Sequence, residues 1–195
     1  MSMKIWRRNS ASFVKLRQTP GTIAHHRTPH ASRPNQPNAT ERRPDLKLLL
    51  ASVTARKLAK SEPCETLVRD YIIRATRFAP TEAASFASEA ALLAAADRQP
   101  GRPAATIVLC DASGNLLSSE DLANLLRQNR DAGTPRMLFG IGPADGWSKS
   151  ALARAAKVVS FGRITLPHEL ARVVLAEQLY RALTILAGHP YHSGH

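Results

Sequence analysis

Residues 164–192 read ITLPHELARVVLAEQLYRALTILAGHPYH, and this stretch decides how the rest of the chain is interpreted. Apolar residues recur at helical spacing behind Pro167, a residue favoured in the first turn of a helix, so the pattern predicts a helix from residue 167 to about 186. Gly188 and then Pro190 end it. The residues predicted to form its buried stripe are Leu170, Val173, Val174, Leu179 and Leu183.

The polar residues of this segment indicate a functional surface. Glu177 and Arg181 stand four residues apart, the spacing of an ion pair along a helix, which taken alone usually marks a solvated face. The run Gly-His-Pro-Tyr-His at residues 188–192 is aromatic and polar, a composition that an ordinary disordered end does not require. We therefore expect the end of the chain to take part in function.

Upstream, short apolar runs alternate with segments of helical pattern. Strands are predicted at residues 46–53, 104–110, 136–141 and 158–161, with a turn at 113–115. Helices are predicted from residue 61 or 62 to 77, from 84 to 96 behind an N-cap at Thr81, from a capping box of Ser118 and Asp121 to about Gly133, and from 148 to 157. This alternation is typical of an α/β fold with a parallel sheet and helices on both faces.

In a parallel sheet of this kind, ligands bind where the carboxyl ends of the strands meet. Here those ends are Cys110–Asp111, residues 140–142 and Phe161–Gly162. The glycines of the run Gly-Ile-Gly-Pro-Ala-Asp-Gly at 140–146 let the backbone approach a ligand closely. Their spacing is not the dinucleotide-binding fingerprint, however, and a plain strand-to-helix turn is the simpler interpretation.

The first 44 residues differ from the rest in composition. They hold nine of the 27 Lys and Arg residues against a single acidic residue, Glu41, together with five prolines and no sustained apolar periodicity. We predict a basic, disordered extension over residues 1–44, either dispensable or an organellar transit peptide, followed by one domain over 45–195. A positive charge of this size suits a polyanionic partner such as nucleic acid.

Composition also argues against several other classes of protein. No apolar run approaches the roughly 20 residues needed to cross a bilayer, so no membrane partner is expected. Cys64 and Cys110 fit neither a disulfide framework nor metal-ligand spacing, and we predict that both are small core residues. His189, His192 and His195 recur every three residues without an acidic or Cys partner, so no metal is expected.

The segment 164–192 closely resembles the C-terminal signature of the RlmH family, the pseudouridine-N3 methyltransferases of large-subunit ribosomal RNA within the SPOUT superfamily. The resemblance continues upstream through residues 141–146, the run Val-Leu-Cys-Asp at 108–111 and the apolar run from Leu46. It implies an α/β domain with a deep trefoil knot near the C-terminus, a homodimer, and S-adenosylmethionine bound in the knot. It further implies 23S rRNA within the ribosome as the substrate, and a cytoplasmic location unless the extension is a transit peptide.

By matching positions, the resemblance also assigns site residues. The cofactor-binding residues would be Cys110, Gly142, Phe161, Gly162, Arg163, Ile164, Thr165 and Leu166. The substrate side would use His168, Arg172, Glu177, Arg181, His189, Tyr191 and His192. Because N3 of pseudouridine carries a proton, His168 or His192 would act as the base. Arg172 or Arg181 would be the cation that favours the deprotonated imide, and the residues leave both choices open.

This sequence departs from the family pattern in four places. Pro143 replaces a glycine, Cys110 an aliphatic residue and Ser193 an arginine, and the stretch between Arg77 and Thr81 is short. The short stretch predicts that a second strand is reduced or absent, which would expose a sheet edge. The departures leave open a catalytically weakened relative that binds rRNA or the ribosome as an assembly factor. A doubly wound nucleotide-binding enzyme is a further alternative, against which the missing fingerprint argues.

Overall fold

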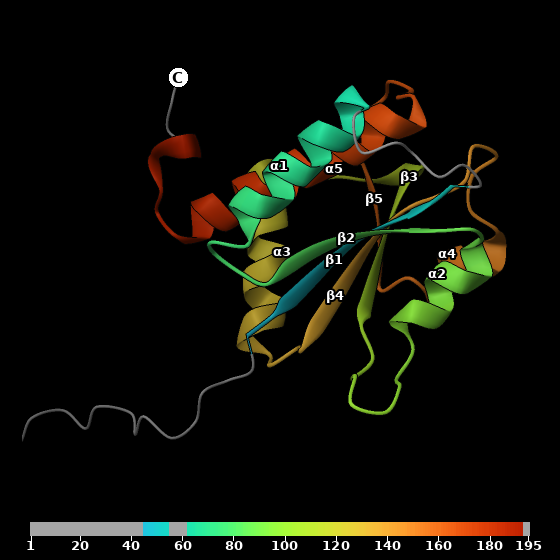
Figure 1. Ribbon diagram of the computed structural model, residues 1–195, viewed down its shortest axis with the longest axis horizontal. Coiled ribbons are helices and arrows are strands. Elements are labelled where there is room, and N and C mark those ends of the chain that lie inside the picture. Colours follow the sequence, from blue (N-terminus) through green and yellow to red (C-terminus); the bar gives the residue numbers. More distant parts are fainter. Residues whose placement is uncertain (1–44, 55–61, 193–195) are drawn as a thin grey trace, which may run out of the picture. The chain divides into compact units, whose positions relative to one another are not determined.

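The computed structural model describes residues 45–54 and 62–192, and in this part the chain forms a five-stranded parallel sheet of order β2-β1-β4-β3-β5 (Figure 1). The strands are β1 Lys47–Val53, β2 Thr81–Phe86, β3 Thr106–Leu116, β4 Arg136–Ile141 and β5 Lys157–Ser160. The helices are α1 Pro63–Ala75, α2 Glu89–Ala96, α3 Ser119–Asp131, α4 Lys149–Arg154 and α5 His168–Leu186, followed by the short 3-10 helix η1 Pro190–His192. The predicted α/β fold is confirmed, whereas the predicted extension over residues 1–44 lies outside the described residues.

Two hydrophobic cores cover the two faces of the sheet, because successive side chains of a strand point to opposite sides. On one face, α1, α3 and α5 pack against side chains that include Leu50 and Phe139. On the other face, α2 and α4 pack against Leu109 and Leu138, among others. Figure 1 shows these two helical layers on either side of the sheet. The carboxyl ends of β3, β4 and β5 lie next to the start of α5.

Local signals in the sequence placed several elements correctly. Strand β4 has the predicted bounds. Ser118 caps α3 as predicted: its hydroxyl accepts a hydrogen bond from the Asp121 amide at 3.1 Å, and the Asp121 carboxylate accepts one from the Ser118 amide at 3.0 Å. The helical pattern at 148–157 yields only the short α4, with Ser148 as its N-cap. Each of these features depends on residues close together in the chain.

The prediction for residues 81–96 is wrong in its first half. Thr81 begins strand β2 instead of capping a helix, and α2 starts only at Glu89, with Ser88 as its N-cap. Because β2 pairs with β1 in parallel register along its whole length, cross-strand hydrogen bonding outweighs the helix propensity of its two alanines. The predicted loss of the second strand is therefore also wrong, since β2 is present and forms one edge of the sheet.

The predicted turn at residues 113–115 is wrong as well, because β3 continues to Leu116 through an irregularity in its pairing with β5. The register shifts between Cys110 and Asn115. Gly114 lies in this irregularity, and a Cβ added there would stand 2.5 Å from the backbone carbonyl carbon of Val159. Only glycine therefore allows the two strands to approach so closely.

Helix α5 runs almost as predicted, but its buried face is different. Leu179 and Leu183 are buried, whereas Leu170, expected in the same stripe, is 45% exposed. Arg172 is buried in its place, only 2% exposed. A buried arginine at this position requires partners, which are described below. Neither α5 nor any other helix in the described residues is long and apolar enough to cross a membrane.

Candidate functional site

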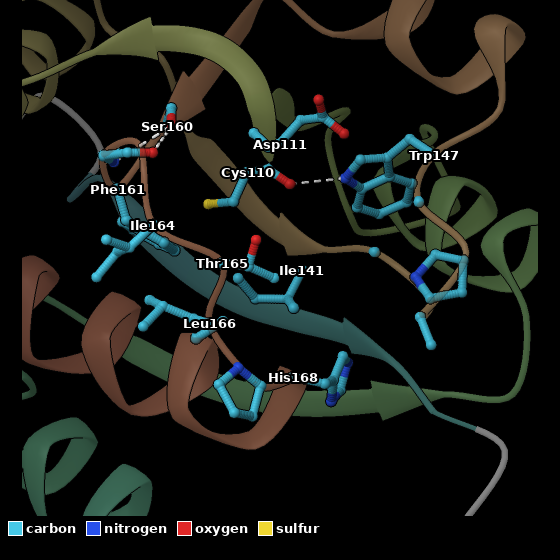
Figure 2. Close-up of a pocket in the computed structure, with 18 residues that line it drawn as sticks. Cys110, Asp111, Ile141, Trp147, Ser160, Phe161, Ile164, Thr165, Leu166 and His168 are labelled. Carbon is cyan, nitrogen blue, oxygen red and sulfur yellow. Dashed lines mark hydrogen bonds between the residues drawn. The ribbon is translucent and has the colours of Figure 1, made fainter.

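A cavity of about 440 Å³ lies where the carboxyl ends of β3, β4 and β5 meet the start of α5 (Figure 2). The three strand ends singled out in the sequence therefore line one cavity. Of the residues expected to bind the cofactor, those that line it are Cys110, Gly142, Phe161, Gly162, Ile164, Thr165 and Leu166. Arg163 is exposed and does not line the cavity. His168, expected on the substrate side, lines it together with Pro167 and Ala171.

One wall of the cavity is the indole of Trp147, a residue that no pattern in the sequence singled out. Its Nε1–H donates a hydrogen bond to the carbonyl oxygen of Cys110 at 2.9 Å, which joins the loop after β4 to β3 (Figure 2). A Cβ on Gly142 would stand 2.9 Å from the Trp147 ring, and one on Gly140 3.1 Å from it. Both glycines are therefore needed to seat the indole, a role distinct from that of a phosphate-binding loop.

The loop after β5 supplies a second wall from its backbone. Gly162 has φ of +129°, a conformation that L side chains rarely adopt, so glycine is required at this turn. The Ser160 hydroxyl fixes the turn, donating to the carbonyl oxygen of Gly162 at 3.0 Å. None of the hydrogen bonds among the described residues involves the backbone of residues 163–166. Those amides and carbonyls are therefore available to a ligand.

Cys110 and Asp111 lie at the carboxyl end of the β3 segment that faces the cavity. Burial, reinforced by the charge of Asp111, raises the pKa of the Cys110 thiol to about 12. Cys110 therefore stays a neutral thiol, as a small wall residue and not a nucleophile. One carboxylate oxygen of Asp111 accepts hydrogen bonds from both the amide and the hydroxyl of Ser113, at 2.9 and 2.5 Å.

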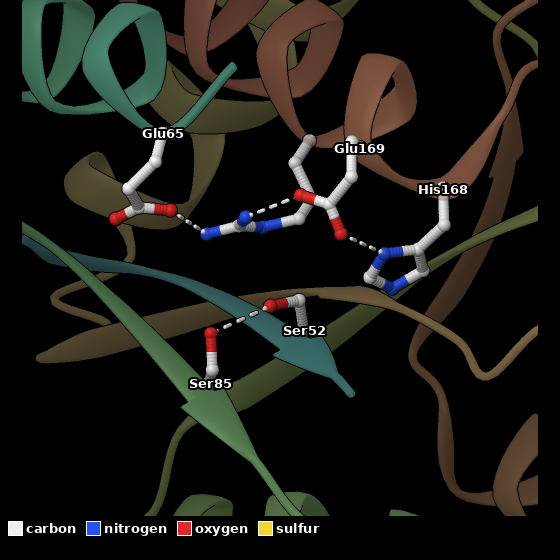
Figure 3. Close-up of polar contacts among 6 residues, drawn as sticks. Ser52, Glu65, Ser85, His168 and Glu169 are labelled. Atoms are coloured by element: carbon white, nitrogen blue, oxygen red, sulfur yellow. Dashed lines mark hydrogen bonds and ion pairs between the residues drawn. The ribbon is translucent and has the colours of Figure 1, made fainter. Parts of the chain in front are cut away.

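At the start of α5, four side chains form a polar chain (Figure 3). His168 Nδ1 lies 3.0 Å from one carboxylate oxygen of Glu169, whose other oxygen accepts a hydrogen bond from Arg172 at 2.7 Å. A second nitrogen of the Arg172 guanidinium donates to Glu65 on α1 at 2.8 Å. Burial acts to lower the pKa of Arg172, but the hydrogen bonds and charges of the two carboxylates outweigh it, so the pKa is raised overall. Arg172 is thus a fully ionised residue with both terminal nitrogens occupied.

A second polar cluster lies near the other end of α5. The Arg181 guanidinium donates to Glu177 at 2.7 and 2.9 Å and lies over the ring of Tyr191, 4.9 Å from its centroid. The Tyr191 hydroxyl donates to the same Glu177 oxygen at 3.2 Å, and its ring packs 4.6 Å from that of Tyr180. Burial first, then the Tyr71 hydroxyl and the charge of Glu177, raise the pKa of Tyr191 to about 12, so its hydroxyl remains a donor.

The residues after α5 extend this second cluster. The His189 ring meets Phe78 edge to face at 5.9 Å, and its Nδ1 accepts a hydrogen bond from the Tyr191 amide at 3.2 Å. The backbone of His192 belongs to η1. No group of three or more His, Cys, Asp or Glu residues that could hold a metal ion occurs in the described part of the chain.

The structure therefore divides the expected substrate residues between two places. His168 lies at the cavity, Arg172 lies just behind it, and Glu177, Arg181, His189 and Tyr191 lie farther along. From residue 168 to 181, an α-helix advances about 20 Å at 1.5 Å per residue. Within one chain, His168 at the cavity and Arg181 in the second cluster therefore lie about 20 Å apart along α5.

Comparison with known proteins shows what this chain is similar to. The family described as "Predicted SPOUT methyltransferase" matches residues 47–192. A relative from Koribacter versatilis (strain Ellin345), named Ribosomal RNA large subunit methyltransferase H, is 52% identical over 136 residues, covering 70% of this chain and 92% of the relative. The protein of the same name from Maricaulis maris (strain MCS10) is 42% identical over 153 residues, covering 72% and 96%. Among solved structures, a probable methylase family protein from Haemophilus influenzae Rd KW20 is 10% identical with a TM-score of 0.43, covering 76% of this chain and 70% of that one.

Proposed function

The chain belongs to the SPOUT methyltransferases, and among them to the RlmH family, and from this premise we propose that it transfers a methyl group from S-adenosylmethionine to large-subunit ribosomal RNA. The acceptor we propose is N3 of a pseudouridine in 23S rRNA, on assembled ribosomes in the cytoplasm. The observation that carries the proposal is the cavity at the strand ends, which is lined by nearly all of the residues assigned to the cofactor.

The chemistry of the cavity fits S-adenosylmethionine. Its volume is that of a small-molecule site, and Ile141, Phe161, Leu166 and Trp147 give it apolar walls suited to an adenine ring. The unengaged backbone of residues 163–166 provides donors and acceptors for the edge of that ring. When bound, the cofactor supplies a methyl group on a positively charged sulfur. The residues of the chain hold and orient it and exclude water from the reacting atoms.

Replacing Gly142 with alanine should weaken S-adenosylmethionine binding by about 10-fold or more, because overpacking typically costs about 1–3 kcal/mol. The added methyl would meet the Trp147 indole at 2.9 Å and push it into the cavity or off its hydrogen bond to Cys110. Isothermal titration calorimetry measures the effect. Unchanged binding by G142A alone would mean that the indole does not shape the cofactor site.

The position of the second cluster leads us to propose a homodimer, in which the end of one chain reaches the cavity of its partner. The separation of about 20 Å along α5 between the two clusters of one chain supports a site built from two chains. Leu67 and Ile73 on α1 and Leu170 on α5 are large apolar side chains that stay exposed in the single chain, as expected for surfaces that a second copy covers. We include in the proposal the C-terminal trefoil knot of this family, with the cofactor in it.

In this arrangement, the second cluster forms the substrate side. Arg181 is held by Glu177 and stacked on Tyr191, so its charge is oriented without being buried. A cation in this position stabilises the negative imide that forms when N3 loses its proton. The neutral Tyr191 hydroxyl locks the carboxylate of Glu177 in place. The segment that follows Gly188, residues 189–192, is called the C-terminal arm. His189, in edge-to-face contact with Phe78, anchors the start of this arm.

Nucleoside mass spectrometry of 23S rRNA tests the proposed substrate. We expect rRNA from a strain that lacks the gene to lose N3-methylpseudouridine, and the wild-type chain to restore it. The variant G142L, which blocks the cavity, should not restore it. Persistence of the methylated nucleoside in the deletion strain would show that the substrate is wrong. A purified chain that binds ribosomes but no S-adenosylmethionine would favour the alternative, an assembly factor.

A further inference from the structure

His168 lines the cavity, and its two ring nitrogens have different surroundings. Nδ1 lies 3.0 Å from a carboxylate oxygen of Glu169. Nε2 is buried and has no hydrogen-bond partner in the part of the chain that the structure describes. Because a buried polar atom without a partner is costly, an unpaired nitrogen at a ligand cavity indicates that a ligand completes it.

The state of Glu169 fixes the tautomer of His168. Burial acts to raise the pKa of Glu169, but hydrogen bonds from His168 and Arg172 and their charges lower it overall, so Glu169 is a carboxylate. A carboxylate only accepts hydrogen bonds, and therefore Nδ1 carries the proton. In the neutral ring, Nε2 is then left with a lone pair.

The orientation of Glu169 is fixed in turn from behind. Arg172, whose side chain is only 3% exposed, donates to Glu169 at 2.7 Å and to Glu65 at 2.8 Å (Figure 3). Its two terminal nitrogens are occupied by carboxylates, whereas its buried Nε has no hydrogen-bond partner among the described residues. Glu65 comes from α1, so this ion pair also ties the start of α5 to a second helix. Such charge-assisted pairs hold their partners in narrow geometry.

The other titratable side chains that line the cavity among the described residues do not suit proton transfer. Cys110 is a neutral thiol whose pKa is raised to about 12, so it holds its own proton. One oxygen of the Asp111 carboxylate is engaged by the amide and hydroxyl of Ser113. A carboxylate is also a far weaker base than an imidazole near neutral pH. Among these groups, His168 remains as the one with a free lone pair on an imidazole nitrogen.

We propose that His168 is the general base of methyl transfer and that Glu169, Arg172 and Glu65 are positioning residues that fix the tautomer and the orientation of its ring; this rests on the proposed function. The N3–H bond of the pseudouridine breaks and its proton passes to Nε2. The electron pair of N3 forms the bond to the methyl carbon, while the carbon–sulfur bond breaks and sulfur keeps its electron pair. Glu169 stabilises the imidazolium that results, as a carboxylate does behind the histidine of a catalytic triad.

The tautomer of His168 provides a test that does not depend on activity. In the free full-length chain labelled with 15N-histidine, the His168 signal is identified by its loss in H168Q. We expect the neutral ring to carry its proton on Nδ1, and we expect E169L to abolish that preference while S-adenosylmethionine binding, measured by calorimetry, stays within about 2-fold. A wild-type ring protonated on Nε2, or an unchanged tautomer in E169L, would overturn the proposal.

Kinetics provide the second test. We expect E169L to lower kcat by about 100-fold, at the lower end of the range for general acid–base catalysis, with little change in KM for ribosomes. E65Q should give a smaller loss in the same direction, because it acts through Arg172. The control is D70N, which removes a carboxylate from an exposed α1 ion pair with Arg74 at 2.7 Å and should change neither kcat nor the tautomer.

These tests separate the failure of this inference from the failure of the proposed function. A wild-type chain that binds no S-adenosylmethionine, or leaves rRNA unmethylated, contradicts the function itself. A wild-type chain that methylates rRNA while E169L keeps full kcat contradicts only the role of Glu169 and its partners. Full kcat in H168Q would exclude His168 as the base. The candidate that remains would then be His192, at the end of η1.

Discussion

Ending the chain at Gly188 should leave S-adenosylmethionine binding intact and lower methyl transfer by at least about 100-fold, the usual cost of losing a group that stabilises developing negative charge. The truncation removes Tyr191, whose ring supports the Arg181 guanidinium and whose hydroxyl donates to Glu177. It spares the cavity, none of whose lining residues lies beyond Ala171. Helix α5 also keeps its C-terminal glycine, which has φ of +64°.

Two measurements on the truncated chain decide this prediction. Calorimetry gives the affinity for S-adenosylmethionine, and single-turnover methylation of ribosomes gives the rate of transfer. The matched control is a chain that ends at His192, which removes only residues 193–195 and should behave as the wild type. A truncated chain with full transfer activity would mean that the C-terminal arm takes no part in catalysis. A truncated chain that binds no cofactor would mean that the arm supports the fold of the cavity.

The parts of the fold that the sequence predicts well are those determined by neighbouring residues. The capping box of Ser118 and Asp121 depends on side chains three positions apart, and the apolar run of β4 depends only on its own composition. The edge strand β2 was missed because its two alanines favour a helix, and the preference is reversed only by pairing with β1, which lies far away in the sequence. No local pattern contains that partner.

The same distinction applies to the candidate site. The strand ends that line the cavity follow from the rule for parallel sheets, so Gly142 and Phe161 could be located in advance. Glu65 could not, because its partner Arg172 is 107 residues away and the pair forms only when α1 packs on α5. From the sequence, Arg172 was one of two candidates for the cation that faces the substrate. Its buried ion pairs with Glu65 and Glu169 instead support a positioning role. The pattern of charged residues along a sequence does not show which of them form ion pairs with each other in the folded chain.

Mixing two inactive variants should restore activity if the site is shared between two chains. One variant, G142L, has a blocked cavity but a complete C-terminal arm, and the other ends at Gly188 and has a free cavity but no arm. In a symmetric dimer, the mixed species contains one site built from the free cavity and the complete arm. Random assortment of equal amounts should therefore recover about a quarter of the wild-type activity.

The experiment requires that the chains exchange, so the two variants are co-expressed with different tags and the mixed dimer is isolated by both. Each variant alone should show near-background transfer, and the purified mixed dimer should reach about half of the wild-type rate because one of its two sites is complete. Activity no higher than that of the separate variants would place Arg181 and the cavity in independent roles. It would contradict a site shared between two chains.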